Sequence, residues 1–132
     1  MAELMDHHLL VELVAGRYTC HELLRAYAAE LSSLLDSPST RSDAVARMVE
    51  HYLYSAEAAT VLLAPHRSTV ILPPPRPGVR PQHFHGRSDA AEWIVAERYL
   101  LPELARSLAH YPRGETFRRQ LTSALEMCVT NP

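Results

Sequence analysis

Apolar residues recur at three- and four-residue spacing over most of this chain, a period that predicts α-helices. One predicted helix runs from about His21 to Asp36, and a longer one follows it to about Ala64. A third begins at the cap Ser88-Asp89, and Pro102 should kink or break it at Leu101-Pro102. Residues 2–8 form a short helix in this interpretation, and a last helix extends from Thr116 to about Val129. Its inward residues are Phe117, Leu121, Leu125 and Cys128.

The two longest predicted helices each have an apolar side. On the first, Leu24 and Leu31 lie at the centre of a stripe that also includes Leu23, Tyr27, Ala28, Leu34 and Leu35. The second is expected to be capped by Thr40 or Ser42. Its stripe consists of Val45, Met48, Val49, Tyr52, Ala56, Ala59 and Leu63.

A small β-hairpin is predicted near residues 9–20. Leu9–Val14 is apolar enough for a strand, Ala15–Arg17 suits the connection, and Tyr18–Cys20 has the β-branched and aromatic content of a return strand. The sequence thus predicts a mainly α fold, with a helical bundle or tetratricopeptide-like helices and one N-terminal hairpin.

Residues 65–87 differ from the rest because they contain six prolines. Val70-Ile71-Leu72 is apolar and is expected to lie extended on the helices, while Pro73-Pro74-Pro75 favours a stiff polyproline conformation. The run from Pro73 to Pro77 could dock in an aromatic groove of a partner, or the segment could be a spacer.

Composition narrows the class of protein. The 132 residues correspond to one ordinary domain, and a formal net charge of −2 does not provide the concentrated basic face of most nucleic-acid binders. Two cysteines, Cys20 and Cys128, imply no disulfide framework. No basic leader and no membrane-spanning apolar run are visible, so we expect a cytoplasmic protein without a membrane partner.

Three blocks of sequence carry a resemblance to a known family. The first joins Gly16-Arg17-Tyr18, the tripeptide Cys20-His21-Glu22 and the helix Leu23–Ala28. The second comprises His51–Ala56 and Leu62–Arg67, and the third is Asp89–Arg98. Together they resemble the end of the winged-helix domain and the start of the helical repeats in STAND/NB-ARC signalling ATPases, nearest to the bacterial AfsR/SARP-like and LuxR-like regulators.

The resemblance implies a division of the chain into four parts. Residues 1–37 would be the C-terminal segment of a winged-helix domain and 38–64 a long connecting helix. Residues 65–87 would be a proline-rich linker, and 88–132 tetratricopeptide-like helices. The implied function is a non-catalytic regulatory and protein-interaction segment of a transcriptional or signalling regulator.

His21 is the main candidate for a functional residue. In the resembled family the histidine of a Met-His-Asp-type tripeptide contacts the β-phosphate of ADP, so His21 and Glu22 are the implied nucleotide-sensing residues. Cys20 and Glu22 depart from the family's Met and Asp, and the chain has no Gly-x-x-x-x-Gly-Lys-Ser/Thr loop to hold a nucleotide. The alternative is structural, with His21 acting as a histidine at a helix start. We therefore expect no cofactor.

The eight histidines suggest an alternative, a small helical metal-binding protein or metalloenzyme. His83-x-His85 is a pair suited to an extended segment, and His21, His51 and His110 could form a helical site. No His-Glu-x-x-His or Gly-x-Ser-x-Gly motif accompanies them, so we expect no metal and no enzyme activity.

Protein–protein contact remains as the expected activity. The candidate contact residues are Leu24, Arg25, Leu31 and Trp93. The side of the helix with Leu24 and Leu31 is expected to face a nucleotide-binding regulator domain, and the later helices another protein. A homodimer is the further prediction, because a segment of a larger protein leaves apolar faces uncovered.

Overall fold

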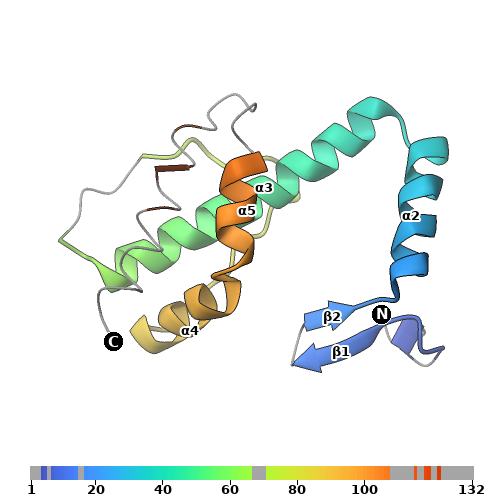
Figure 1. The fold of residues 1–132 in the computed structure, drawn as a ribbon. Helices are drawn as coiled ribbons and strands as arrows, with labels where there is room; N and C mark the ends of the chain where they lie inside the picture. The colour runs from blue at the N-terminus through green and yellow to red at the C-terminus, as the bar shows by residue number, and fades with distance from the viewer. Residues whose placement is uncertain are drawn as a thin grey trace. The chain divides into compact units, whose positions relative to one another are not determined.

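In a computed structural model of the chain, the described residues are 4–5, 7–14, 17–66, 71–107, 115, 118–119 and 122. They form two compact units, residues 1–44 and residues 45–132, which we call the first and second unit. The elements are one two-stranded antiparallel sheet followed by helices (Figure 1). The predicted fold class, mainly α with one N-terminal hairpin, is confirmed. None of the described helices is long and apolar enough to cross a membrane.

The first unit contains the predicted hairpin. Strand β1 spans Val11–Val14 and strand β2 spans Arg17–Thr19, with Val11 opposite Thr19 and Glu12 opposite Tyr18. β1 is shorter than the predicted Leu9–Val14, whereas β2 has the predicted length and begins one residue before the predicted Tyr18–Cys20. Leu9 and Leu10 instead close a turn, since the N–H groups of both donate to the carbonyl of Leu4.

Helix α2, Glu22–Leu35, matches the predicted helix closely. Its C-terminal end is closed by a side chain from the next helix, because Nη1 of Arg41 donates to the carbonyls of Ser32, Ser33 and Asp36 at 3.2, 3.3 and 2.8 Å. These carbonyls include ones that the helix cannot satisfy itself. Arg41 therefore fixes the corner between the two helices.

Helix α3, Pro38–Leu63, begins earlier than expected. The predicted caps Thr40 and Ser42 are wrong: Ser37 is the cap, and its Oγ accepts from the N–H of Thr40 at 3.1 Å. Pro38 is the first helical residue, a position where its fixed φ and missing N–H are favourable. Ser37-Pro38, which predicts the end of the preceding helix, is therefore also the start of α3.

The buried side of α3 is shifted from the predicted stripe. Val45 and Met48 are 42% and 47% exposed, whereas Ala46 is buried. The residues of α3 that pack in the second unit are Ala46, Val49, Ser55, Ala56 and Ala59. The predicted stripe is therefore wrong at its N-terminal end, because the packing partners of α3 cover the side that starts at Ala46.

The segment after α3 lies along this helix. Tyr54 donates through its hydroxyl to the carbonyl of Pro73, and Glu50 accepts from the N–H of Arg76 at 2.8 Å. A turn follows at Pro77-Gly78, where Gly78 has φ +85°, the conformation that a type II turn requires at this position. Contrary to the prediction for Val70-Ile71-Leu72, Ile71 does not pack on the helices, since it is 96% exposed.

After the turn the chain returns along α3 in the opposite direction. Nδ1 of His51 bonds the carbonyl of Arg80 at 2.7 Å, and Oγ of Ser55 accepts from the N–H of Gln82 at 2.8 Å. Phe84 then packs against Ala59. The proline-rich segment is thus held against helix α3, within the second unit, at several points.

Helix α4 spans Arg87–Glu97 and helix α5 spans Leu100–Ser107. The predicted cap Ser88-Asp89 is wrong, because Gly86 is the cap residue; Asp89 instead accepts from the N–H of His85 at 3.0 Å. The break lies at residues 98–99, ahead of the predicted Leu101-Pro102. Pro102 occupies the first turn of α5, where no intrahelical N–H bond is lost.

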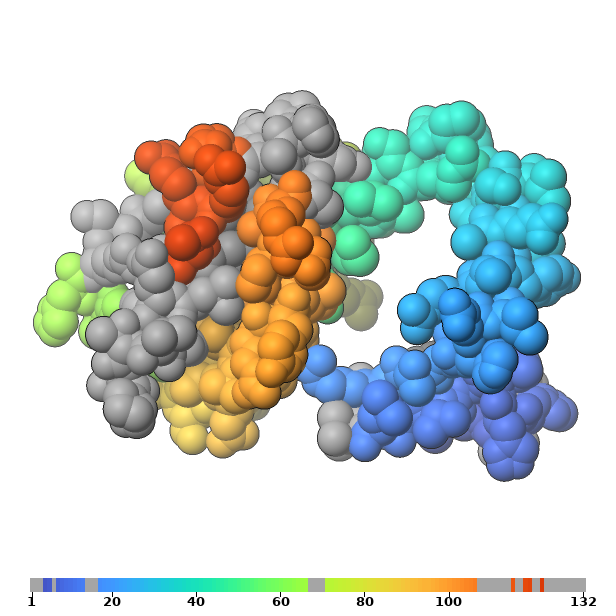
Figure 2. Space-filling view, viewed as in Figure 1, coloured from blue at the N-terminus to red at the C-terminus, as the bar shows by residue number. Residues whose placement is uncertain are grey.

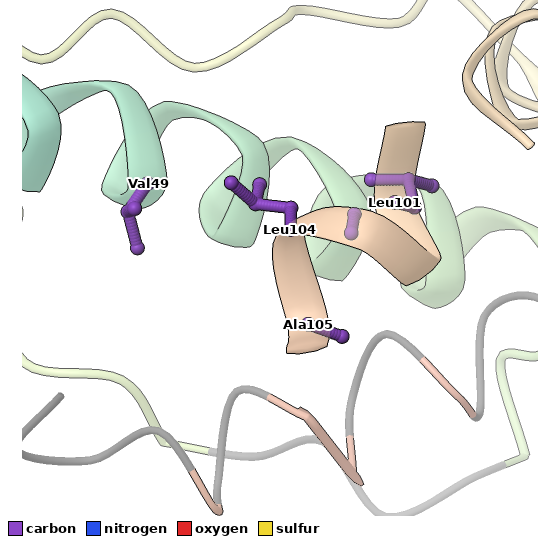
Figure 3. Close-up of a cluster of buried hydrophobic side chains, with 5 residues drawn as sticks. Val49, Leu101, Leu104 and Ala105 are labelled. Atoms are coloured by element: carbon purple, nitrogen blue, oxygen red, sulfur yellow. The ribbon is translucent and has the colours of Figure 1, made fainter. Parts of the chain in front are cut away.

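Two apolar clusters form the core of the second unit. In the first, Leu101, Leu104 and Ala105 of α5 lie over α3 and cluster with its residues Val49 and Ala56 (Figure 3). The second cluster contains Ala59, Phe84, Ala90 and Ile94. In the space-filling view α4 and α5, yellow-orange to orange, form one continuous column of side chains (Figure 2). The predicted inward residues Phe117, Leu121, Leu125 and Cys128 lie outside the described residues.

Candidate interaction site on α2

The first turn of α2 is capped by the imidazole of His21. Nδ1 of His21 accepts a hydrogen bond from the backbone N–H of Leu23 at 3.2 Å, and the carbonyl of His21 accepts from the N–H of Arg25 at 3.1 Å. Because Nδ1 accepts, the neutral ring carries its proton on Nε2. Glu22 stands in the first turn, where a carboxylate is favourable to the helix dipole. His21 thus lies at the start of α2, as predicted, and caps it.

His51 has the opposite tautomer. Its Nδ1 bonds the carbonyl oxygen of Arg80, and since a carbonyl can only accept, Nδ1 is the donor. The ring also meets the Tyr52 ring edge to face, with centroids 5.1 Å apart. His51 therefore holds the returning segment against α3.

The apolar side of α2, defined by Leu24, Tyr27, Leu31 and Leu34, contains no buried residue. Leu24 and Leu31 are half-buried, while Tyr27 and Leu34 are 57% and 72% exposed. Arg25 is also exposed on this helix, away from its apolar side. The helix thus presents large apolar side chains that make only partial contacts within the described chain.

Trp93, the remaining predicted contact residue, lies between the two apolar clusters of the second unit. Its ring stacks on Tyr52 with centroids 6.4 Å apart and meets Phe84 edge to face at 5.5 Å. Trp93 is half-buried, so only part of its ring is available to a partner. Because it belongs to the second unit, it is a separate feature from the apolar side of α2.

The histidines that suggested a metal site do not assemble one among the residues that the structure describes, where no three His, Cys, Asp or Glu side chains converge. His83 and His85 have ring centroids 5.3 Å apart and are both exposed. His110 and Cys128 lie outside the described residues. Cys20 is a half-buried free thiol.

An ionisable pair in the hairpin was not predicted from the sequence. The carboxylate of Glu12, directly across the ladder from Tyr18, raises the pKa of the Tyr18 phenol above its usual 10.0, with smaller contributions from burial and from a hydrogen bond to Glu12. In the sequence Glu12 and Tyr18 flank the turn, but they can be recognised as a cross-strand pair only once the strand register is known.

The chain is similar to part of a regulatory protein. Over 109 residues it is 29% identical to "Regulatory protein AfsR" of Streptomyces griseus, and the match covers 80% of this chain and 11% of that protein. Because the match covers 11% of that protein, the chain spans about a tenth of the length of this curated relative. No protein-family model matches the chain, and no solved structure matches it. The similarity supports a regulatory protein as the class and leaves the role of this stretch to be inferred.

Proposed function

We propose that this chain is a non-catalytic regulatory segment that acts through protein–protein contact in a transcriptional or signalling regulator of the STAND type. The observation that carries the proposal is the apolar side of α2, a helix of 14 residues without one buried residue. A helix of that length is marginal in water, and most helical stability in proteins comes from packing of an apolar face. Contact with a partner would supply the missing burial.

The partner that the resemblance favours is a nucleotide-binding regulator domain. Large contiguous apolar surface marks interaction sites, and α2 adds to Tyr27 and Leu34 the exposed side chains of Leu23 and Leu35. Arg25, exposed on the same helix, could pair with a carboxylate of a partner that also reaches round α2. Similarity to a regulatory protein is consistent with such a role.

His21 and Glu22 have a finer role in the proposal. With Nδ1 of His21 accepting from Leu23, the N–H of Nε2 is the donor left for a ligand. A phosphate oxygen on the partner's bound nucleotide is an acceptor of suitable charge. In this proposal His21 contacts the nucleotide only when the partner provides the loop that binds its phosphates.

The four-part division is part of the same proposal. A winged-helix-like segment would occupy residues 1–37, and its limit coincides with the Ser37 cap of α3. The helix at 38–64, the proline-rich connection at 65–87 and tetratricopeptide-like helices at 88–132 would follow. Helices α4 and α5, which meet at a short turn, are the described elements that support the last part.

Binding in trans tests the proposal. The probe is the Streptomyces griseus AfsR protein with the stretch that matches this chain deleted, titrated with the purified chain by calorimetry. Binding is expected to weaken at least about tenfold in Tyr27→Glu/Leu34→Glu, which places charges on an apolar contact surface. Both side chains are exposed, so the substitutions remove little packing within the chain.

Ser33→Glu is the matched control, because Ser33 is exposed on the opposite side of the same helix. It should bind like the parent chain. Absence of binding by the parent chain, with and without ADP, would refute the partner, and equal loss in both variants would refute the assigned side of α2. If ADP changes the affinity of the parent chain and of the other variants but not that of His21→Ala, the nucleotide-sensing role is supported as well.

A further inference from the structure

The connection between α3 and α4 is the most basic part of the chain. From residue 58 to residue 88 the sequence has no acidic residue, whereas it has the arginines Arg67, Arg76, Arg80 and Arg87 and the histidines His66, His83 and His85. The whole chain nevertheless has a formal net charge of −2. Charge is therefore segregated, and positive charge gathers next to α3.

The structure arranges the last part of this connection in a line. The returning segment contacts α3 first at His51, through the carbonyl of Arg80, and last at Leu62, whose carbonyl accepts from Nη1 of Arg87 at 3.0 Å. Those contacts advance along α3 over a length of about 16 Å, given a helical rise of about 1.5 Å per residue. We call Arg80, His83, His85 and Arg87 the basic strip.

All four side chains of the basic strip are exposed, whereas Phe84 between the two histidines is buried. In extended chain neighbouring side chains point to opposite sides, so burial of Phe84 turns His83 and His85 outward. Their ring centroids are 5.3 Å apart. The strip thus presents a row of cationic or protonatable groups on a fixed backbone.

The acidic groups nearby on α3 and α4 each have a partner. Glu50 pairs with Nε of Arg76 at 3.0 Å, and Asp89 accepts from the N–H of His85. Glu92 accepts from the hydroxyl of Ser88 at 3.3 Å, and Glu57 is half-buried and has a partner of its own. These carboxylates reduce the positive potential of the strip, and Asp89 does so from beside His85.

We propose that the basic strip binds an extended acidic segment of a partner protein. Carboxylates on alternate residues of an extended chain recur about every 6.6 Å, so three of them would span the strip. Arginine binds carboxylates through paired N–H donors, and the two exposed imidazoles supply further N–H donors. This site lies in the second unit and is independent of the apolar side of α2.

A nucleic acid fits the strip less well. Single-stranded nucleic acid is bound by a cationic groove together with aromatic rings on which the bases stack. Phe84, the one phenyl, phenol or indole ring in residues 80–87, is buried in the core. With both histidines neutral the strip has two full positive charges, few for a phosphate backbone.

The test uses the full chain and a fluorescein-labelled peptide of alternating Glu and Ser with four Glu residues. Its anisotropy should report binding that weakens with added salt. The variant Arg80→Gln/His83→Gln/His85→Gln should lower the affinity at least about tenfold, as loss of several exposed charge pairs predicts. Single Arg80→Gln should give a partial loss, since its anchor to α3 is a backbone carbonyl.

Arg98→Gln/Arg106→Gln is the control, because it removes two positive charges from exposed positions at the α4–α5 corner and in α5. It should leave the affinity nearly unchanged, and circular dichroism should show the same helix content in every variant. No binding at low salt would overturn the proposal, as would undiminished binding by the triple variant. Tighter binding of a twelve-residue oligothymidine than of the peptide would overturn it in favour of a nucleic acid.

Discussion

The hydroxyl of Ser55, fully buried in α3, accepts a hydrogen bond from the backbone N–H of Gln82 at 2.8 Å. The same oxygen donates its own proton to the carbonyl of His51 at 2.6 Å. A single side chain therefore joins the helix to a segment 27 residues further on. Its side chain is fully buried and holds the two segments together at this point.

Ser55→Ala should destabilise the second unit by about 1–3 kcal/mol, because the N–H of Gln82 loses its acceptor and the carbonyl of His51 loses the hydroxyl. The measurement is a chemical denaturation curve, together with hydrogen exchange of the Gln82 amide, which should lose its protection. Thr60→Ala is the control. Its hydroxyl donates only to the carbonyl of Ala56 in the same helix at 2.8 Å, so its removal should cost less than about 0.5 kcal/mol. Equal losses would contradict the bridging role.

A second pair of substitutions tests where the core lies. Ile94 is fully buried in the cluster with Ala59 and Phe84, so Ile94→Ala should cost about 2–5 kcal/mol through lost burial and a residual cavity. Ile71 is 96% exposed, and Ile71→Ala should stay within about 0.5 kcal/mol of the parent chain. Denaturation midpoints measure both. A comparable loss in Ile71→Ala would show that the apolar segment packs after all.

Periodicity predicted the helices well because it reflects burial of one side of each element. The limits of α2 agree with the prediction within a residue, since His21 and Asp36 are unmistakable boundaries. The start of α3 was missed because Ser37-Pro38 has two interpretations. A proline stops a preceding helix and also favours the first position of the next, and local sequence does not choose between them.

Long-range polar contacts escaped prediction for a different reason. Ser55 is a small polar residue within an apolar stripe, a pattern that signals a buried hydrogen bond without naming its partner. Gln82, the partner, lies in a segment that composition alone describes as a spacer. Of the candidate site, the helix start at His21 and the apolar side of α2 could be read from sequence, whereas the basic strip depends on how the connection folds back along α3.

The hairpin should be sensitive to alkaline pH. Since the Glu12 carboxylate raises the pKa of Tyr18, the neutral phenol is the form that the folded hairpin prefers. That contribution is complete below the pKa of the unfolded chain and is lost as the pH rises through the higher pKa of the folded state. Hairpin amide protection should therefore fall above about pH 10, the ordinary value for tyrosine. Tyr18→Phe should remove this dependence, and Glu12→Gln should lower the pH at which the phenol titrates.

The imidazole cap should contribute to the stability of α2. His21→Ala removes the acceptor of the bond from the N–H of Leu23, so the helix should lose about 1 kcal/mol of stability. The measurement is amide exchange, in which the protection of the Leu23 amide should fall.

His21→Asn distinguishes the cap from other effects of the substitution. The Asn side chain caps a helix through a carbonyl oxygen, so the protection of residue 23 should be kept. The Gln82 amide, which donates to Ser55 in the second unit, is the internal control and should be equally protected in both variants. Amide exchange followed residue by residue reports both sites in one experiment. If the Leu23 amide of His21→Ala is as well protected as that of the parent chain, the imidazole is not the group that holds the first turn of α2.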